Sequence, residues 1–247
     1  MAAALRKRSL GKSEEVLRSL AKSFIASPHA VGGYCLGKLD LTGISQTGPP
    51  TVSLLLINQV GAWDRAFSLW VHAHSAPWLD QLMLTLTYGG DWRFLLLVTL
   101  ASVVFLFRWQ LGKRAPLLLS LAFSLSYLAN PLLKSIFQRQ RPDLWEVFAR
   151  PSSYSFPSGH AMSAMMVYGI AAFLFAQRYP QHRRVWLCSA ASWIFLIGFS
   201  RIYLGVHWLS DVVAGFAIGF VFVYALVRWY KLSEATATSP DPHSPLR

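Results

Sequence analysis

Three short clusters of charged and polar residues interrupt a chain that is otherwise strongly apolar. They are Lys134 with Arg141-Pro142, then Pro157-Ser158-Gly159-His160, and finally Ser200-Arg201 with His207 and Asp211. Lysine and arginine bind the oxygens of phosphoryl groups, and histidine can act either as a nucleophile or as an acid. Together the clusters predict a site for phosphoryl chemistry.

Lys134, Arg141 and Arg201 supply three fixed positive charges, and the planar fork of arginine suits a phosphoryl group. Ser158 is expected to cap the start of a helix, and Gly159 leaves room for a ligand to approach the backbone. A helix N-terminus also favours an anion. Taken singly, each of these residues fits an ordinary interfacial or capping role, so the prediction depends on the whole set.

The two histidines differ in their surroundings. Asp211 follows His207 by one helical turn, so its carboxylate can fix the tautomer of that ring and leave the other nitrogen free as a nucleophile. His160 is then available to protonate a leaving oxygen. Two histidines and an aspartate could also bind a divalent metal, but the nearby cations favour an anion, so we expect neither a metal nor a cofactor.

Long apolar blocks must position these residues. The chain is 54% hydrophobic and 14% charged, with a mean hydropathy of +0.38. The blocks are residues 84–108, 115–137, 158–177, 185–204 and 208–230. Each is long enough to cross the roughly 30 Å hydrocarbon core of a membrane. The sequence therefore predicts an all-α polytopic transmembrane helical bundle, and the alternation of spans places all three clusters on one face.

Residues 51–73 are ambiguous. Asp64 and Arg65 would lie in mid-membrane if this stretch crossed the bilayer, which costs several kcal/mol. The spacing of the large apolar residues Trp63, Phe67, Trp70 and Val71 favours a helix at the membrane interface instead. We therefore expect five spans, with a sixth over 51–73 as the alternative.

The chain divides into three parts. Residues 1–50 are polar and basic, with a possible amphipathic surface helix over 13–24; residues 51–231 form the membrane domain; and residues 232–247 are expected to be a disordered tail. The early charges are followed by no apolar run typical of a cleaved signal peptide. The net charge is +12, but the bases gather in loops and at the ends of apolar blocks, which favours anionic lipid or a phosphate substrate over nucleic acid.

The basic links predict sidedness. Arg108, Lys113 and Arg114 lie on the same face as Arg178, Arg183 and Arg184, and the positive-inside rule makes that face cytoplasmic. The clusters would then face outward from the cytoplasm, although Arg139, Arg141 and Arg150 also lie there, and the basic N-terminus fits only if 51–73 spans. Outside the clusters we interpret Asp91 and Arg93 as structural, Cys35 and Cys188 likewise, and His72, His74 and His182 as surface residues.

The three clusters resemble the three signature motifs of the type 2 phosphatidic acid phosphatase superfamily, with every motif position matched in order. The resemblance implies a metal-independent phosphatase of helical-bundle fold. It further implies that His207 attacks phosphorus to form a phosphohistidine, that Asp211 orients His207 and that His160 protonates the leaving group. The phosphoryl oxygens would be held by Lys134, Arg141, Ser158, Gly159 and Arg201.

The resemblance also implies an integral membrane protein of the cell's inner membrane with its site on the periplasmic face. Members usually have six spans, and a clear first span is missing here. The expected substrate is a lipid phosphate or a polyprenyl diphosphate, with phosphatidate and phosphatidylglycerophosphate as candidates. The alternatives are a catalytically silent lipid-binding protein on the same fold, a phosphatase of a soluble ester, a haloperoxidase and a transporter. The sequence leaves the substrate and the oligomeric state open.

Overall fold

The computed structural model describes residues 52–108, 112–147 and 151–238, and all of the regular structure in these ranges is helical. The helices are α2 (Val52–Ala73), α3 (Pro77–Tyr88), α4 (Trp92–Arg108), α5 (Arg114–Phe137), α6 (Gly159–Arg178), the short 3-10 turn η1 (Pro180–His182), α7 (Arg183–Tyr203) and α8 (Leu209–Thr238). The predicted all-α fold is confirmed. Residues 1–50, with the predicted surface helix, lie outside the described residues.

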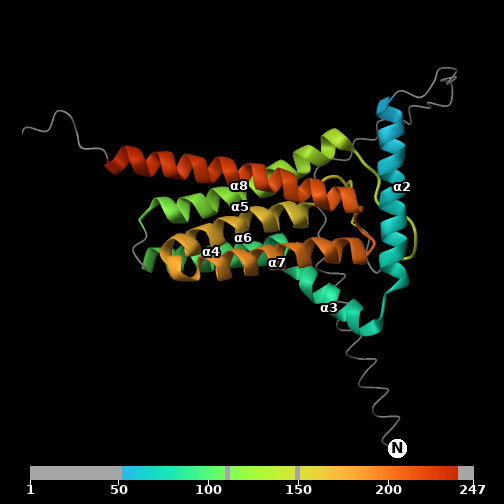
Figure 1. Cartoon of the computed structure of the whole chain (residues 1–247), viewed down its shortest axis with the longest axis horizontal. Coiled ribbons are helices and arrows are strands. Elements are labelled where there is room, and N and C mark those ends of the chain that lie inside the picture. The colour runs from blue at the N-terminus through green and yellow to red at the C-terminus, as the bar shows by residue number, and fades with distance from the viewer. Residues whose placement is uncertain (1–51, 109–111, 148–150, 239–247) are drawn as a thin grey trace, which may run out of the picture.

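Four helical segments are long and apolar enough to cross a membrane: α5, α6, η1 with α7, and α8. They lie side by side with α4 in one bundle (Figure 1). Helix α6 is the centre of this bundle and packs on α5, α7 and α8. Large apolar side chains turn outward on the neighbouring helices, among them Leu128, Phe195 and Val221, as expected for a surface that faces lipid.

The predicted span over 84–108 is bent: it corresponds to the end of α3 followed by α4. Helices α3 and α4 meet at a bend of 53°, and the pair makes a fifth span only if it is counted as one broken helix. Gly89 and Gly90 follow the end of α3, and the Asp91 carboxylate accepts a hydrogen bond of 2.9 Å from the backbone N–H of Arg93, so it caps the start of α4. We call residues 87–92 the elbow.

Helix α2 lies across one end of the bundle instead of running along it (Figure 1). It is not among the helices whose length and hydropathy fit a span. Asp64, Ser68 and Val71 form its buried face, whereas the side chains of Trp63 and Trp70 are 72% and 59% exposed. These features favour the interfacial interpretation of this segment, because tryptophan is typical of the membrane–water boundary.

The last helix is longer than the sequence suggested. Helix α8 continues to Thr238, so residues 232–238, which we assigned to the tail, are helical. The rest of the predicted tail lies outside the described residues.

Candidate active site

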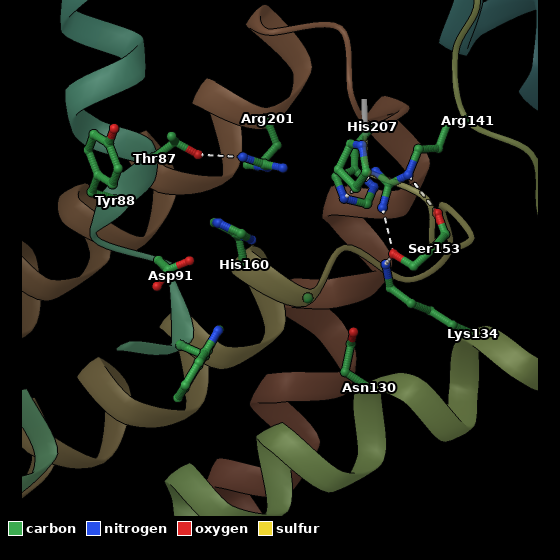
Figure 2. A pocket seen from close by; sticks show the side chains of 13 residues that line it. Thr87, Tyr88, Asp91, Asn130, Lys134, Arg141, Ser153, His160, Arg201 and His207 are labelled. Carbon is green, nitrogen blue, oxygen red and sulfur yellow. Dashed lines mark hydrogen bonds between the residues drawn. The ribbon is translucent and has the colours of Figure 1, made fainter. Parts of the chain in front are cut away.

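The three clusters meet at the end of the bundle that α2 crosses. A cavity of about 180 Å³ lies between the last turns of α3, α5 and α7, the first turn of α6 and the segment before α8. Among the predicted residues, its lining includes Lys134, Arg141, Gly159, His160, Arg201 and His207 (Figure 2). Of the predicted residues, Lys134 and His207 are 73 positions apart in sequence and still line one pocket, as the alternation of spans predicts.

His207 and Asp211 lie together, although His207 precedes α8 and is not part of it. Nδ1 of His207 is 3.4 Å from Oδ2 of Asp211, and the two residues are buried. The same carboxylate oxygen accepts hydrogen bonds from the backbone N–H of Trp208, at 2.9 Å, and from the hydroxyl of Ser155. With Nδ1 turned to the carboxylate, Nε2 of His207 faces the pocket.

Two cations lie beside Nε2 of His207 and are held by the segment around Ser153. Arg141 places Nη1 at 3.2 Å from Nε2 and donates from Nε to the Ser153 carbonyl at 2.7 Å. Lys134 donates to the Tyr154 carbonyl at 2.7 Å and to the Ser153 hydroxyl at 3.1 Å. These bonds orient the two cations around the space in front of Nε2 of His207.

Arg201, at the end of α7, is buried on another wall of the pocket. Its Nη1 donates a hydrogen bond of 2.7 Å to the hydroxyl of Thr87 in the elbow (Figure 2). Its Nε is buried and has no hydrogen-bond partner among the described residues. A buried donor without a partner is costly, and an anion in the pocket would remove that cost.

The start of α6 differs from the prediction. Ser158 occupies the N-cap position, but its side chain makes no capping hydrogen bond, and its hydroxyl is buried without a partner in the described part of the chain. The space beside Gly159 is taken by Asn130, since a Cβ at Gly159 would lie 2.8 Å from the Asn130 side-chain oxygen. Gly159 lines the pocket all the same, whereas the buried Ser158 is not among the residues that line it.

His160 lies on the side of the pocket next to the elbow. Figure 2 places its ring between Arg201 and Asp91. The backbone of Gly90 packs against it so closely that a Cβ there would lie 2.9 Å from Cβ and Cδ2 of His160. The elbow therefore sets the position of this imidazole, and His160 and His207 reach the pocket from different helices.

Sequence reasoning missed several residues that hold the predicted ones. Thr87 binds Arg201, Ser155 binds Asp211, and Arg139 joins Asp211 to Asp64. Arg139 lies inside the first cluster, so its position was a signal that we did not use. Thr87 and Asp64 belong to helices far from the clusters. Nothing in the local sequence marks Thr87, whereas Asp64 is an acid in an apolar stretch, a signal that we used only to judge whether residues 51–73 span.

The electrostatic setting of His207 keeps its ring neutral. Burial holds the pKa of the imidazole well below its usual value, and the charges of Arg141, Lys134 and Arg201 lower the pKa further. A neutral imidazole with one nitrogen facing a carboxylate and the other facing cations can act as a nucleophile toward an anionic phosphoryl group. In the described ranges, no group of three histidine, cysteine or acidic residues is arranged to hold a metal ion.

Comparison with known proteins agrees with this geometry. Phosphatidylglycerophosphatase B of Bacillus subtilis is 34% identical over 180 residues, which cover 70% of this chain and 85% of that protein. The lipid A 1-phosphatase of Rhizobium johnstonii is 34% identical over 170 residues, covering 65% of this chain and 62% of that protein.

A solved structure shares the fold. The crystal structure of a transmembrane PAP2-type phosphatidylglycerolphosphate phosphatase from Bacillus subtilis matches with a TM-score of 0.68 and 31% identity, covering 73% of this chain and 96% of that one. Residues 115–234, which carry all three clusters, match the model of the PAP2 superfamily. The chain is an integral membrane protein that belongs to the PAP2 superfamily.

Proposed function

We propose that this protein is a phosphatase that hydrolyses a membrane lipid phosphate or diphosphate, with His207 as the nucleophile. The observation that carries the proposal is the orientation of the His207 ring. Nδ1 faces the Asp211 carboxylate at 3.4 Å, and Nε2 faces a pocket lined by the cations of Lys134, Arg141 and Arg201.

In the first step, the lone pair of His207 Nε2 attacks phosphorus, and the bond from phosphorus to the leaving oxygen breaks. His160 in its imidazolium form gives a proton to that oxygen and becomes neutral, and Asp211 stabilises the positive charge that develops on His207. In the second step, His160 takes a proton from water, and the resulting hydroxide attacks phosphorus and breaks the phosphorus–nitrogen bond. Inorganic phosphate leaves, and both histidines return to their starting states.

The remaining polar groups bind the phosphoryl oxygens. Lys134, Arg141 and Arg201 balance the negative charge, and Arg201 Nε, which has no partner among the described residues, supplies a further hydrogen bond. None of these groups is a metal ligand, so the mechanism derives its charge stabilisation from side chains of the protein.

The size and place of the pocket support a lipid substrate. The cavity of about 180 Å³ is lined by Lys134, Arg141 and Arg201 together with two histidines, so it suits a phosphoryl group better than acyl chains. The chains must lie outside, along apolar helices that already face lipid. The similar proteins named above act on phosphatidylglycerophosphate and lipid A, which are both lipids with phosphate monoesters.

The proposal is tested by phosphate release from the full chain purified in detergent. The substrates are phosphatidate, phosphatidylglycerophosphate, undecaprenyl diphosphate and a soluble sugar phosphate. We expect release from at least one lipid and its loss in His207→Ala, with the variant unchanged in gel filtration. Release that survives in His207→Ala would contradict the proposed nucleophile, and release from the sugar phosphate alone would contradict the lipid substrate.

We propose further that the pocket faces away from the cytoplasm, in the cell's inner membrane. Arg178, Arg183 and Arg184 lie at the opposite end of the bundle, where the positive-inside rule predicts the cytoplasm. A chain with Cys35 and Cys188 replaced by serine would receive one cysteine, at the exposed Ser75 or at the exposed Gln181. A membrane-impermeant maleimide should label only the Ser75 position in intact cells, and the reverse pattern would contradict this orientation.

A further inference from the structure

A network of charged side chains joins α2 to the first turn of α8. Asp64 of α2 is buried, and its Oδ2 lies 2.6 Å from Nη2 of Arg139. Nη1 of the same guanidinium lies 2.6 Å from Oδ1 of Asp211. Arg139 therefore bridges two carboxylates, one of which is the partner of His207.

The network is well satisfied by hydrogen bonds. Asp64 accepts from the backbone N–H of Ser210 at 2.8 Å and from its hydroxyl at 2.5 Å. Arg139 also donates to the Ser210 hydroxyl, at 2.6 Å. Attachment of α2 to α8 needs only the contacts between Asp64 and Ser210. Arg139 adds something that attachment does not require, because its half-buried guanidinium, with the side chain 29% exposed, lies directly against the buried carboxylate of Asp211.

The two oxygens of Asp211 have separate partners. Oδ1 binds Arg139, whereas Oδ2 binds Ser155, the backbone N–H of Trp208 and His207. This division fixes the rotation of the carboxylate, so Oδ2 stays turned toward Nδ1. It also means that Arg139 and His207 interact with the same negative charge. The more strongly Arg139 binds the Asp211 carboxylate, the more weakly that carboxylate stabilises a positive charge on His207.

We propose that Arg139 and Asp64 are positioning residues for the catalytic pair His207 and Asp211. Arg139 holds Oδ1 and thereby aims Oδ2 at the imidazole, while Asp64 offsets the charge of Arg139 so that Asp211 remains an effective partner for His207. Helix α2 thus contributes a residue that acts on the catalytic pair, although it precedes the part of the chain matched by the family model. This inference rests on the proposed role of His207 as the nucleophile.

The inference makes opposite predictions for the two residues. The charged and titratable groups that face His207 are Lys134 of α5, Arg141 after α5, His160 of α6, Arg201 of α7 and Asp211 of α8. All five of these groups remain in each Asp64, Arg65 and Arg139 variant. Differences in the pH profile between variants then report on the network of Asp64 and Arg139.

The experiment is the pH dependence of kcat/KM for the full chain in detergent, with each profile scaled to its own maximum. Arg139→Gln frees the charge of Asp211 for His207, so the acid limb should move to higher pH by about half a unit or more. Asp64→Asn leaves the charge of Arg139 unopposed, so the limb should move to lower pH. Both variants should also lose about 10- to 100-fold in kcat, the effect of one hydrogen bond to a charged group.

Two further variants separate positioning from attachment. In the Arg139→Gln background, Asp64→Asn should move the acid limb much less than in the wild type, because Asp64 acts on His207 through the charge of Arg139. Arg139→Lys keeps the charge and should leave the limb near its wild-type position while kcat falls. Arg65→Gln removes an exposed charge from the same helix and should change neither quantity.

Shifts of opposite sign support the inference. A loss of activity with an unchanged limb, or shifts of the same sign, would overturn it and leave the network as a simple attachment of α2. If Arg139→Gln does not fold, the comparison of Asp64→Asn with Arg65→Gln is sufficient. An acid limb at lower pH in Asp64→Asn supports the inference, and an unchanged acid limb overturns it. His207→Ala is assayed in parallel, because activity in that variant would refute the proposed function itself.

Discussion

The Nη1 atom of Arg141 lies 3.2 Å from Nε2 of His207, so a fixed cation sits beside the nitrogen that we propose as the nucleophile. A phosphoryl group that enters the pocket must accept hydrogen bonds from this guanidinium in place of Nε2 before the lone pair of Nε2 becomes available. The contact therefore couples substrate binding to exposure of the nucleophile, and it lowers the basicity of the ring in the free protein.

The first prediction concerns pH. Burial and the charges of Arg141, Lys134 and Arg201 hold the pKa of His207 well below its usual value of about 6.5. Catalysis needs the neutral ring, so the contribution of His207 to kcat/KM should be complete at pH 6.5 and decline only as the pH falls through the lowered pKa. Arg141→Gln removes one of these cations and should move the acid limb to higher pH.

The measurement is kcat/KM against pH for wild type and variant with the same lipid, so that the ionisation of the substrate cancels in the comparison. Arg178→Gln changes an arginine at the opposite end of the bundle and serves as the control. An acid limb at the same pH in Arg141→Gln and the wild type would contradict the electrostatic role of Arg141.

The second prediction concerns the elbow. Thr87→Val removes the acceptor of the 2.7 Å hydrogen bond from Arg201 and leaves a buried guanidinium without that partner. A hydrogen bond to a charged group contributes about 1.5–3 kcal/mol, which corresponds to a loss of roughly 10- to 100-fold in kcat/KM. Thr87→Ser keeps the hydroxyl and should retain most of the activity. Equal losses in the two variants would show that the hydrogen bond is not the cause.

The third prediction compares two glycines. Gly90→Ala would place a Cβ 2.9 Å from His160 and 2.7 Å from Ile197, so the His160 ring must shift and kcat should fall. Gly61→Ala, on the exposed surface of α2, meets no atom within 4 Å and should leave kcat unchanged. That variant should also raise the stability by about 0.5–1 kcal/mol, as alanine does in a helix. Full activity in Gly90→Ala would mean that the elbow does not position His160.

The fourth prediction concerns metals. The phosphoryl site is built from lysine, arginine and histidine, so phosphate release should continue in the presence of EDTA. The assay compares initial rates with and without the chelator, and then after addition of Mg²⁺. Complete loss of activity in EDTA that Mg²⁺ restores would refute a mechanism that depends on side chains alone.

Much of the site could be predicted from the sequence because its residues lie at the ends of apolar blocks. Lys134, His160 and Arg201 each come at a boundary between a span and a loop, and the alternation of spans brings such boundaries to one face. The order and spacing of these residues were sufficient to predict both the chemistry and the helical bundle.

The bend at the elbow could not be predicted from the sequence, because hydropathy is averaged over windows longer than a turn. The apolar residues before Gly89 and after Asp91 read as one block, and the two glycines alone did not predict a bend of 53°. The partners of the catalytic residues were hidden for another reason. Contacts such as those of Thr87 with Arg201 depend on how distant helices pack, and no periodicity in either helix encodes that register.

The small volume of the pocket has a kinetic consequence. Because only the phosphorylated end of the lipid enters, the enzyme meets its substrate by diffusion within the plane of the bilayer or over the surface of a micelle. The quantity that governs the encounter is then the fraction of the surface occupied by substrate. Diluting a mixed micelle with buffer should leave the turnover of bound enzyme unchanged, whereas adding more detergent at the same substrate concentration should slow it.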